Sequence, residues 1–221
     1  MIITLTLPKP SDILIDAVRT AANNRPINYQ SQQWHKNLQP SHKNCAAGDF
    51  FEDQLVNDLV ASEYQKYFTE PITPLVGVIH NTESTPASYP PHSDRVRIVG
   101  VNYYIDLGGD NVETVFYNKV DPEDDNIGGH VLSYDNLPEV HSIEHFTSGP
   151  WYALAARRYH SVENILTSRC LLTLCVKSPT FEKFLINYRH MLAEDTGFEP
   201  VITISKTVAL GQTKLIPNKL L

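Results

Sequence analysis

Short strand-like segments separated by turn residues dominate the middle of the chain, and this pattern constrains the fold more than any other feature. Seven such segments lie between residues 72 and 177: 73–80, 95–107, 113–118, 130–134, 141–146, 151–156 and 169–176. The turn residues between them are Pro90-Pro91, Gly108-Gly109, Gly128-Gly129 and Gly149-Pro150. Many short strands at close spacing predict an antiparallel sandwich or barrel.

Helices are predicted on both sides of this strand-rich part, so the chain is expected to be mainly β with flanking helices. Ser11 or Asp12 can cap a helix that runs to about Ala22, and 50–68 has helical spacing of its apolar residues. A late helix is expected over 181–195. The outer strands are expected at 2–7 and 201–210, and the segments 23–49 and 81–91 are expected to be irregular and to form lids over the mouth of the barrel.

The length of 221 residues fits one domain, 1–221. Its barrel core is expected at about 72–177, its N-terminal helices at about 11–68, and a C-terminal helix and strand at about 180–210.

Composition narrows the class of protein. The net charge of −7 disfavours nucleic-acid binding through phosphate neutralisation. No stretch of about 18 apolar residues predicts a membrane span. The three cysteines form no CxxC pair, which favours reduced thiols, and the first residues carry no basic, apolar leader. We therefore expect a cytoplasmic protein without a membrane partner.

The segment Pro91-His92-Ser93-Asp94 carries the most chemical information. Residues i and i+2 of an extended chain project to the same face, so His92 and Asp94 can converge on one point. His160, after the strand-like segment 151–156, is the best candidate for a third ligand. Two imidazoles and one carboxylate on one face are typical of non-haem Fe(II) sites.

Arg169 follows His160 by nine residues and begins an apolar strand. A cation at the root of a buried strand needs an anionic partner. A hairpin between the two residues would place both in one barrel mouth, where a guanidinium is suited to bidentate binding of a carboxylate.

These motifs together resemble one enzyme family. The run PHSDRVRIVGVNYYIDL, followed by HSVENILTSRCLLTL, is similar to the 2-oxoglutarate/Fe(II)-dependent oxygenases, nearest to their prolyl-hydroxylase-like branch. Arg97 before Tyr103-Tyr104-Ile105-Asp106, then Gly108-Gly109 and Thr114-Val115-Phe116, extend the resemblance over about residues 75–177. It implies a double-stranded β-helix, the jelly-roll or cupin-like barrel.

The resemblance also implies roles for individual residues. His92, Asp94 and His160 would be the catalytic iron ligands. Arg169 would bind the distal carboxylate of 2-oxoglutarate. Tyr104 would donate its hydroxyl group to the same carboxylate, and Asn102 would lie near the cosubstrate. The implied cofactors are Fe(II), 2-oxoglutarate and O₂, with ascorbate as a supporting reductant.

The expected activity is hydroxylation of a peptidyl residue or a small molecule, coupled to conversion of 2-oxoglutarate to succinate. Two alternatives stay open at this stage. One is a cupin-like metal isomerase or hydrolase with Zn²⁺ or Mn²⁺ at the same three residues. The other is a non-catalytic barrel that binds a carboxylate or a protein. The strand expected at 201–210 could pair across a two-fold axis and give a homodimer.

Overall fold

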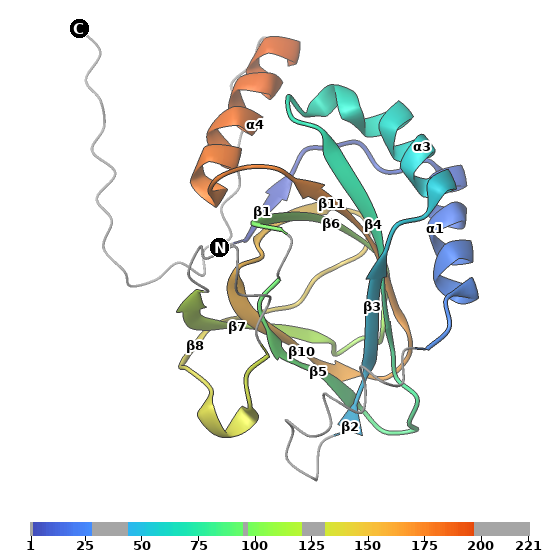
Figure 1. Ribbon diagram of the computed structural model, residues 1–221, viewed down its shortest axis with the longest axis vertical. Coiled ribbons are helices and arrows are strands. Elements are labelled where there is room, and N and C mark those ends of the chain that lie inside the picture. The colour runs from blue at the N-terminus through green and yellow to red at the C-terminus, as the bar shows by residue number, and fades with distance from the viewer. Residues whose placement is uncertain (1, 28–43, 95–96, 121–130, 197–221) are drawn as a thin grey trace, which may run out of the picture.

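Two β-sheets face each other in the computed structural model, which describes residues 2–27, 44–94, 97–120 and 131–196 (Figure 1). The larger sheet has the strand order β1-β9-β6-β11-β4-β3. Its strands are β1 (Ile2–Leu5), β3 (Ala47–Phe51), β4 (Ile72–His80), β6 (Val99–Leu107), β9 (Trp151–Ala155) and β11 (Arg169–Val176).

The smaller sheet has the order β2-β5-β10-β7-β8. Its strands are β2 (Asn44–Cys45), β5 (Ala87–His92), β7 (Glu113–Val120), β8 (Val140–Glu144) and β10 (Arg158–Ile165). Two 3₁₀ turns, η1 (Gln65–Tyr67) and η2 (Tyr134–Asn136), and three helices, α1 (Asp12–Asn24), α3 (Gln54–Tyr64) and α4 (Phe181–Thr196), complete the described elements.

The strands from β4 to β11 pair in a nested order. β4 pairs with β11, β5 with β10, β6 with β9 and β7 with β8, each pair antiparallel. One long two-stranded ribbon is thus folded so that its successive parts fall into the two sheets. This is the double-stranded β-helix, or jelly roll, and it confirms the predicted fold class. In the described residues no hydrogen-bonded ladder joins the two sheets, so the barrel is not closed.

Apolar side chains cover the outer face of the larger sheet. Val76 and Leu172 on that face, together with Val18 of α1 and Val56 of α3, have no exposed surface. Figure 1 shows α1 and α3 lying against this sheet. Ser11 caps α1, since its Oγ accepts the backbone N–H of Leu14 at 3.2 Å. The helices therefore fix the larger sheet from outside and leave its inner face to the site.

The space between the sheets is only partly filled by apolar side chains. Phe116 of the smaller sheet packs with Tyr104 and Leu171 of the larger one. The inner faces also carry buried polar residues, among them Asn102, His160, Arg169 and Thr173. Since burying polar groups costs free energy unless they find partners, these side chains mark where the molecule departs from an ordinary core.

Several elements differ from the sequence expectations. The helix expected over 50–68 begins only at Gln54, and Phe50 and Phe51 belong to β3. The expected lid 81–91 contains the start of β5, and 158–165 is a full strand, β10. The strand expected at 130–134 is wrong: Val131 makes an isolated bridge to His92, and a 3₁₀ turn begins at Tyr134.

The strand expected at 201–210 and most of the segment 23–49 lie outside the described residues. Among the helices that the structure does describe, none is both long and apolar enough to cross a membrane.

Candidate metal centre

His92 and His160 are brought together by strand pairing. They are direct partners in the antiparallel register of β5 and β10. Both project to the inner face of the smaller sheet, and their ring centroids lie 4.4 Å apart. Residues 68 positions apart in the chain therefore meet because two neighbouring strands hold them opposite each other.

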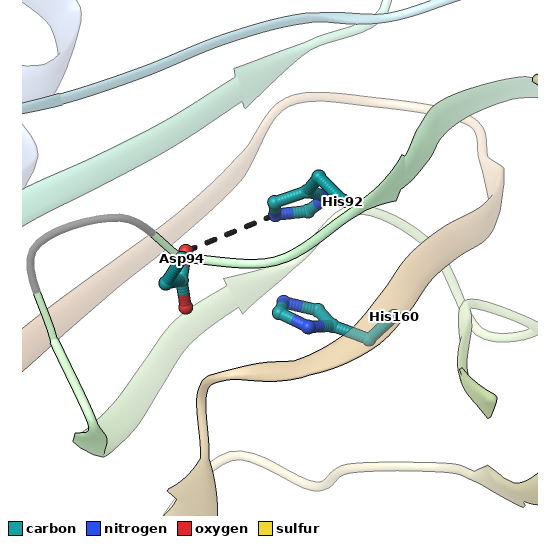
Figure 2. A group of neighbouring side chains, drawn as sticks. All are labelled: His92, Asp94 and His160. Carbon is teal, nitrogen blue, oxygen red and sulfur yellow. Dashed lines mark ion pairs between the residues drawn. The ribbon is translucent and has the colours of Figure 1, made fainter. Parts of the chain in front are cut away.

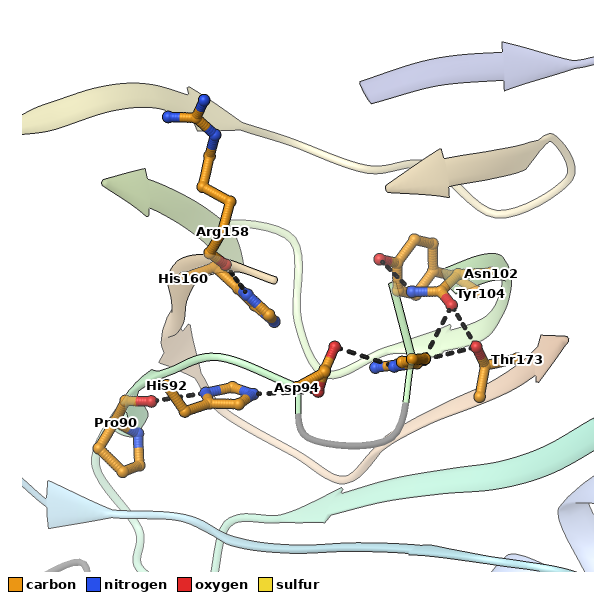
Figure 3. A network of polar contacts seen from close by, with 9 residues as sticks. Pro90, His92, Asp94, Asn102, Tyr104, Arg158, His160 and Thr173 are labelled. Carbon is orange, nitrogen blue, oxygen red and sulfur yellow. Dashed lines mark hydrogen bonds and ion pairs between the residues drawn. The ribbon is translucent and has the colours of Figure 1, made fainter. Parts of the chain in front are cut away.

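Backbone carbonyl groups fix the orientation of both rings. The Nδ1 atom of His92 lies 2.8 Å from the carbonyl oxygen of Pro90, and that of His160 lies 2.9 Å from the carbonyl oxygen of Arg158 (Figure 3). A carbonyl oxygen can only accept, so each Nδ1 carries the proton and donates it. Each Nε2 then keeps a free lone pair. In this tautomer, Nε2 is the atom through which a histidine binds a metal.

Asp94 completes the group from the loop after β5. Its Oδ1 lies 3.9 Å from Nε2 of His92, and its backbone N–H donates to the carbonyl oxygen of Ala156 at 3.0 Å. One ligand atom from each of His92, Asp94 and His160 falls within 4.8 Å of the other two (Figure 2). Three side chains named from the sequence thus converge on one point.

The charge states of the three groups suit a divalent cation. Burial, and then the neighbouring His160, lower the pKa of His92 to about 4. Burial also lowers the pKa of His160. For Asp94, burial acts to raise the pKa, but Arg97 and the two histidines outweigh it and lower the pKa. Near neutral pH the group therefore consists of two neutral imidazoles and one carboxylate, which fits Fe(II) and leaves further coordination positions open.

Arg169 lies at the other end of the same cavity, at the start of β11. Its side chain is buried, with 3% of the residue exposed, and its guanidinium carbon lies 4.6 Å from the centroid of the Tyr104 ring. No ion pair joins it to a carboxylate of the described residues. Burial lowers its pKa, against an opposing effect of Tyr104. A desolvated cation of this kind can bind an anion.

Asn102 and Tyr104 connect the two ends. Both are buried on β6, and the amide of Asn102 donates to the Tyr104 hydroxyl group at 3.4 Å. The cavity leaves about 40 Å³ of space for the centres of water-sized molecules, within about 420 Å³ of non-atom space that includes open solvent. Its lining is Phe50, Ile79, Tyr89, His92, Arg97, Asn102, Tyr104, Thr114, Leu154, His160, Val162, Arg169 and Leu171. Five of the six predicted site residues line it, and Asp94 contacts it through Arg97.

Sequence reasoning missed part of this cavity. Phe50 falls within the expected helix 50–68, and Thr173, which shares the inner face of β11 with Arg169 and binds Arg97 of the lining, has no role in the sequence-based prediction. Strand alternation was the available signal for Thr173.

Among the comparisons with known proteins, only the comparison with solved structures finds matches to this chain. No protein-family model and no curated protein matches the chain. A Pseudomonas putida prolyl-4-hydroxylase is 12% identical with a TM-score of 0.38, over 79% of this chain and 91% of that one. A cupin domain from Bordetella pertussis is 10% identical with a TM-score of 0.33, over 62% and 97%.

An oxidoreductase of the 2OG-Fe(II) oxygenase family from Burkholderia pseudomallei is 11% identical with a TM-score of 0.29. The match covers 56% of this chain and 51% of that one. Likeness at this level carries no argument about activity. What defines the class of this protein is its own strand pairing and its own cavity: a jelly-roll protein with a His-Asp-His group and a buried guanidinium between its two sheets.

Proposed function

We propose that the protein is a non-haem Fe(II)- and 2-oxoglutarate-dependent dioxygenase that hydroxylates a peptidyl residue or a small molecule. The observation that supports this is the presence, in and beside one cavity, of two neutral imidazoles, the carboxylate of Asp94, and the buried guanidinium of Arg169, which has no carboxylate partner among the described residues. A metal alone would need the first three groups. The fourth supports the proposal of a second ligand, an anion, that would bind in the same space.

Each residue has a distinct task in this proposal. His92, Asp94 and His160 would hold Fe(II) through Nε2, a carboxylate oxygen and Nε2. Arg169 would bind the distal carboxylate of 2-oxoglutarate, with Tyr104 and Asn102 as hydrogen-bonding groups beside it. The iron and cosubstrate together supply oxidative decarboxylation to succinate and CO₂, coupled to hydroxylation of a C–H bond.

The apolar part of the lining has a task as well. Leu154, Val162 and Leu171 line the cavity that also contains Arg169, and they would help to exclude water from it. Exclusion of water strengthens the ion pair that Arg169 would form with a carboxylate, and it protects reactive species from side reactions.

The test measures 2-oxoglutarate turnover and ligand binding in the same preparations. With Fe(II), ascorbate and O₂, the protein is expected to form succinate from 2-oxoglutarate. Asp94→Ala is expected to abolish this turnover. Asp106→Ala is the matched control, because Asp106 also pairs with an arginine, Arg19, but at the surface, where the two side chains are 45% and 47% exposed.

Thermal melts with Mn(II), which has no oxidative turnover here, complete the experiment. Mn(II) and 2-oxoglutarate together should raise the melting temperature more than either alone, because each ligand would bind the native state at one shared site. Joint stabilisation by Mn(II) and 2-oxoglutarate, together with no O₂ consumption by the Fe(II)-loaded protein, would instead support the isomerase or hydrolase alternative. Activity that survives in Asp94→Ala, or the absence of any joint stabilisation, would overturn the proposal.

A further inference from the structure

Arg97 is a second buried guanidinium, and it lies against the metal group rather than at the anion end. It stands three residues after Asp94, just before β6, and 6% of the residue is exposed. Its Nε donates to Oδ2 of Asp94 at 2.9 Å. Arg97 therefore contacts the one carboxylate of the metal group, on the oxygen that is not the one facing His92.

The far side of this guanidinium is held as firmly as the near side. Nη1 of Arg97 donates to Oγ1 of Thr173 at 2.6 Å and lies 3.5 Å from Oδ1 of Asn102. The Thr173 hydroxyl group in turn donates to the same oxygen of Asn102 at 2.6 Å. Figure 3 shows this chain of contacts running from Asp94 to β6 and β11. Two strands of the larger sheet thus determine where the guanidinium points.

The neighbouring residues leave a space that fits this guanidinium. The ring of Phe50 lies under it, with 4.9 Å between the guanidinium carbon and the ring centroid. On another side, a Cβ atom at Gly100 would lie only 3.1 Å from Nη1. A glycine at position 100 therefore makes room for Arg97, and an aromatic face supports it from below.

These contacts have a consequence for the metal group. When Oδ2 of Asp94 is bound to Arg97, only Oδ1 remains directed towards the imidazoles. We infer that Arg97 is a positioning residue: it fixes the carboxylate of Asp94 so that one oxygen is offered to the metal and the other is withheld. This inference rests on the proposed metal centre, and it adds a residue that acts through Asp94 and does not touch the metal.

The planar, forked shape of arginine is essential to this role. One guanidinium can donate through Nε to Asp94 and through Nη1 to Thr173 at the same time, whereas an ammonium group is a compact point charge on a flexible chain. Arg97→Lys therefore keeps the positive charge beside the metal group and removes the fixed orientation. The Arg97→Lys variant therefore tests the effect of side-chain geometry alone. A neutral replacement would also remove the repulsion between the positive side chain and the metal cation.

The experiment has two measurements on metal-free protein, both without 2-oxoglutarate. The first is a titration with Mn(II), which gives the affinity of the metal group. The second is the visible absorption spectrum of the protein loaded with Co(II), which reports the geometry of the ligands. Arg97→Lys is expected to weaken Mn(II) binding by roughly 10- to 100-fold, the usual cost of losing a partner of a metal ligand, and to change the Co(II) spectrum. Arg19→Lys, which alters the exposed pair with Asp106, should change neither.

A second variant guards against misfolding of the first. Thr173→Val keeps the volume of the side chain but removes the hydroxyl group that holds Nη1, so it should weaken Mn(II) binding in the same direction and by less. Folded Arg97→Lys and Thr173→Val proteins that bind Mn(II) as tightly as the wild type would overturn the inference. Wild-type protein that binds Mn(II) through Asp94 but forms no succinate would overturn the proposed function and leave this inference standing. Wild-type protein whose Mn(II) binding does not depend on Asp94 would overturn both.

Discussion

At the scale of single residues, Arg169 offers the sharpest prediction because it is buried with no carboxylate partner among the described residues. Desolvation of a buried cation costs several kcal/mol, and a cation–π contact such as the one with Tyr104 returns about 2 kcal/mol. Arg169→Met should therefore leave the melting temperature of the ligand-free protein unchanged or raise it. It should also remove stabilisation by 2-oxoglutarate in the presence of Mn(II).

The binding of Mn(II) alone separates the two ends of the cavity. It should not weaken in Arg169→Met, since Arg169 contacts none of the three candidate ligands and its positive charge opposes a cation beside His160, and Arg19→Met provides the surface control. If Arg169→Met is still stabilised by 2-oxoglutarate in the presence of Mn(II), then the cosubstrate does not bind through Arg169.

The sequence could predict which residues gather at the cavity but not how they are joined. Strand alternation places His92 and Asp94 on one face, and the apolar run after Arg169 places that cation at the root of a strand. The contact of Arg97 with Thr173 depends on the register of β6 against β11, which pairs Asn102 with Thr173 across 71 positions of the chain and includes an irregularity after Cys170. No local pattern encodes such a register. The roles of the six named residues stay predictions.

At the scale of elements, the start of α1 is tied to α3 by one side chain. Ser11 accepts the N–H of Leu14, and its own hydroxyl group and backbone N–H donate to Glu63 of α3 at 2.5 and 3.1 Å. Ser11→Ala should lower the free energy of unfolding by about 1–2 kcal/mol, the range for loss of an N-cap. Ser11→Thr, which keeps the hydroxyl group, should lose much less.

Urea unfolding of a double-mutant cycle measures the tie between the two helices. If Ser11 and Glu63 act together, Glu63→Ala should cost less in the Ser11→Ala background than in the wild type, by about 0.5 kcal/mol or more. Strictly additive losses would contradict the described contact. Mn(II) affinity should be the same in all four proteins, since both residues lie on the outer side of the larger sheet.

The elements that sequence patterns missed are those whose surroundings hide the usual strand signals. β5 contains Pro90 and Pro91, which mark turns in most contexts. Here its neighbour β2 pairs only with Ala87 and Ser88, so the two prolines lie beyond that ladder, where a missing N–H is tolerated.

β10 lacks clean apolar alternation because Ser161 and Glu163 on its outer face are polar. Glu163 accepts hydrogen bonds there from the hydroxyl groups of Ser88, Ser161 and Tyr134. The bond from Tyr134 also holds the turn η2 to this face, at the place where the sequence had suggested a strand.

At the scale of the whole molecule, the site exists only after the nested strand pairs have formed. β4 and β11 pair residues about a hundred positions apart, and β5 and β10 bring His92 to His160. His160 is far from His92 and Asp94 in an unfolded chain, so any free energy of metal binding at all three adds to the free energy of unfolding. Stability comparisons between variants should for this reason be made on metal-free protein.

Under metal-free conditions, His80 should make stability depend on pH. It ends β4, away from the three candidate ligands, with Nδ1 2.9 Å from the Ser168 hydroxyl oxygen and with a buried Nε2 that has no hydrogen-bond partner in the described structure. Burial lowers its pKa. Below about pH 6.5, the ordinary value for histidine, the unfolded chain therefore binds a proton that the folded protein resists, so stability falls as the pH falls.

Urea unfolding between pH 7 and pH 5.5 tests this dependence, with the free energy of unfolding compared between the wild type and His80→Asn at each pH. One proton contributes at most about 1.4 kcal/mol per pH unit, and His80→Asn should remove the share that His80 contributes while Asn keeps a polar group near Ser168. The wild type should thus lose stability more steeply than His80→Asn as the pH falls. Equal slopes in the wild type and His80→Asn would mean that His80 is free to take up its proton in the folded protein.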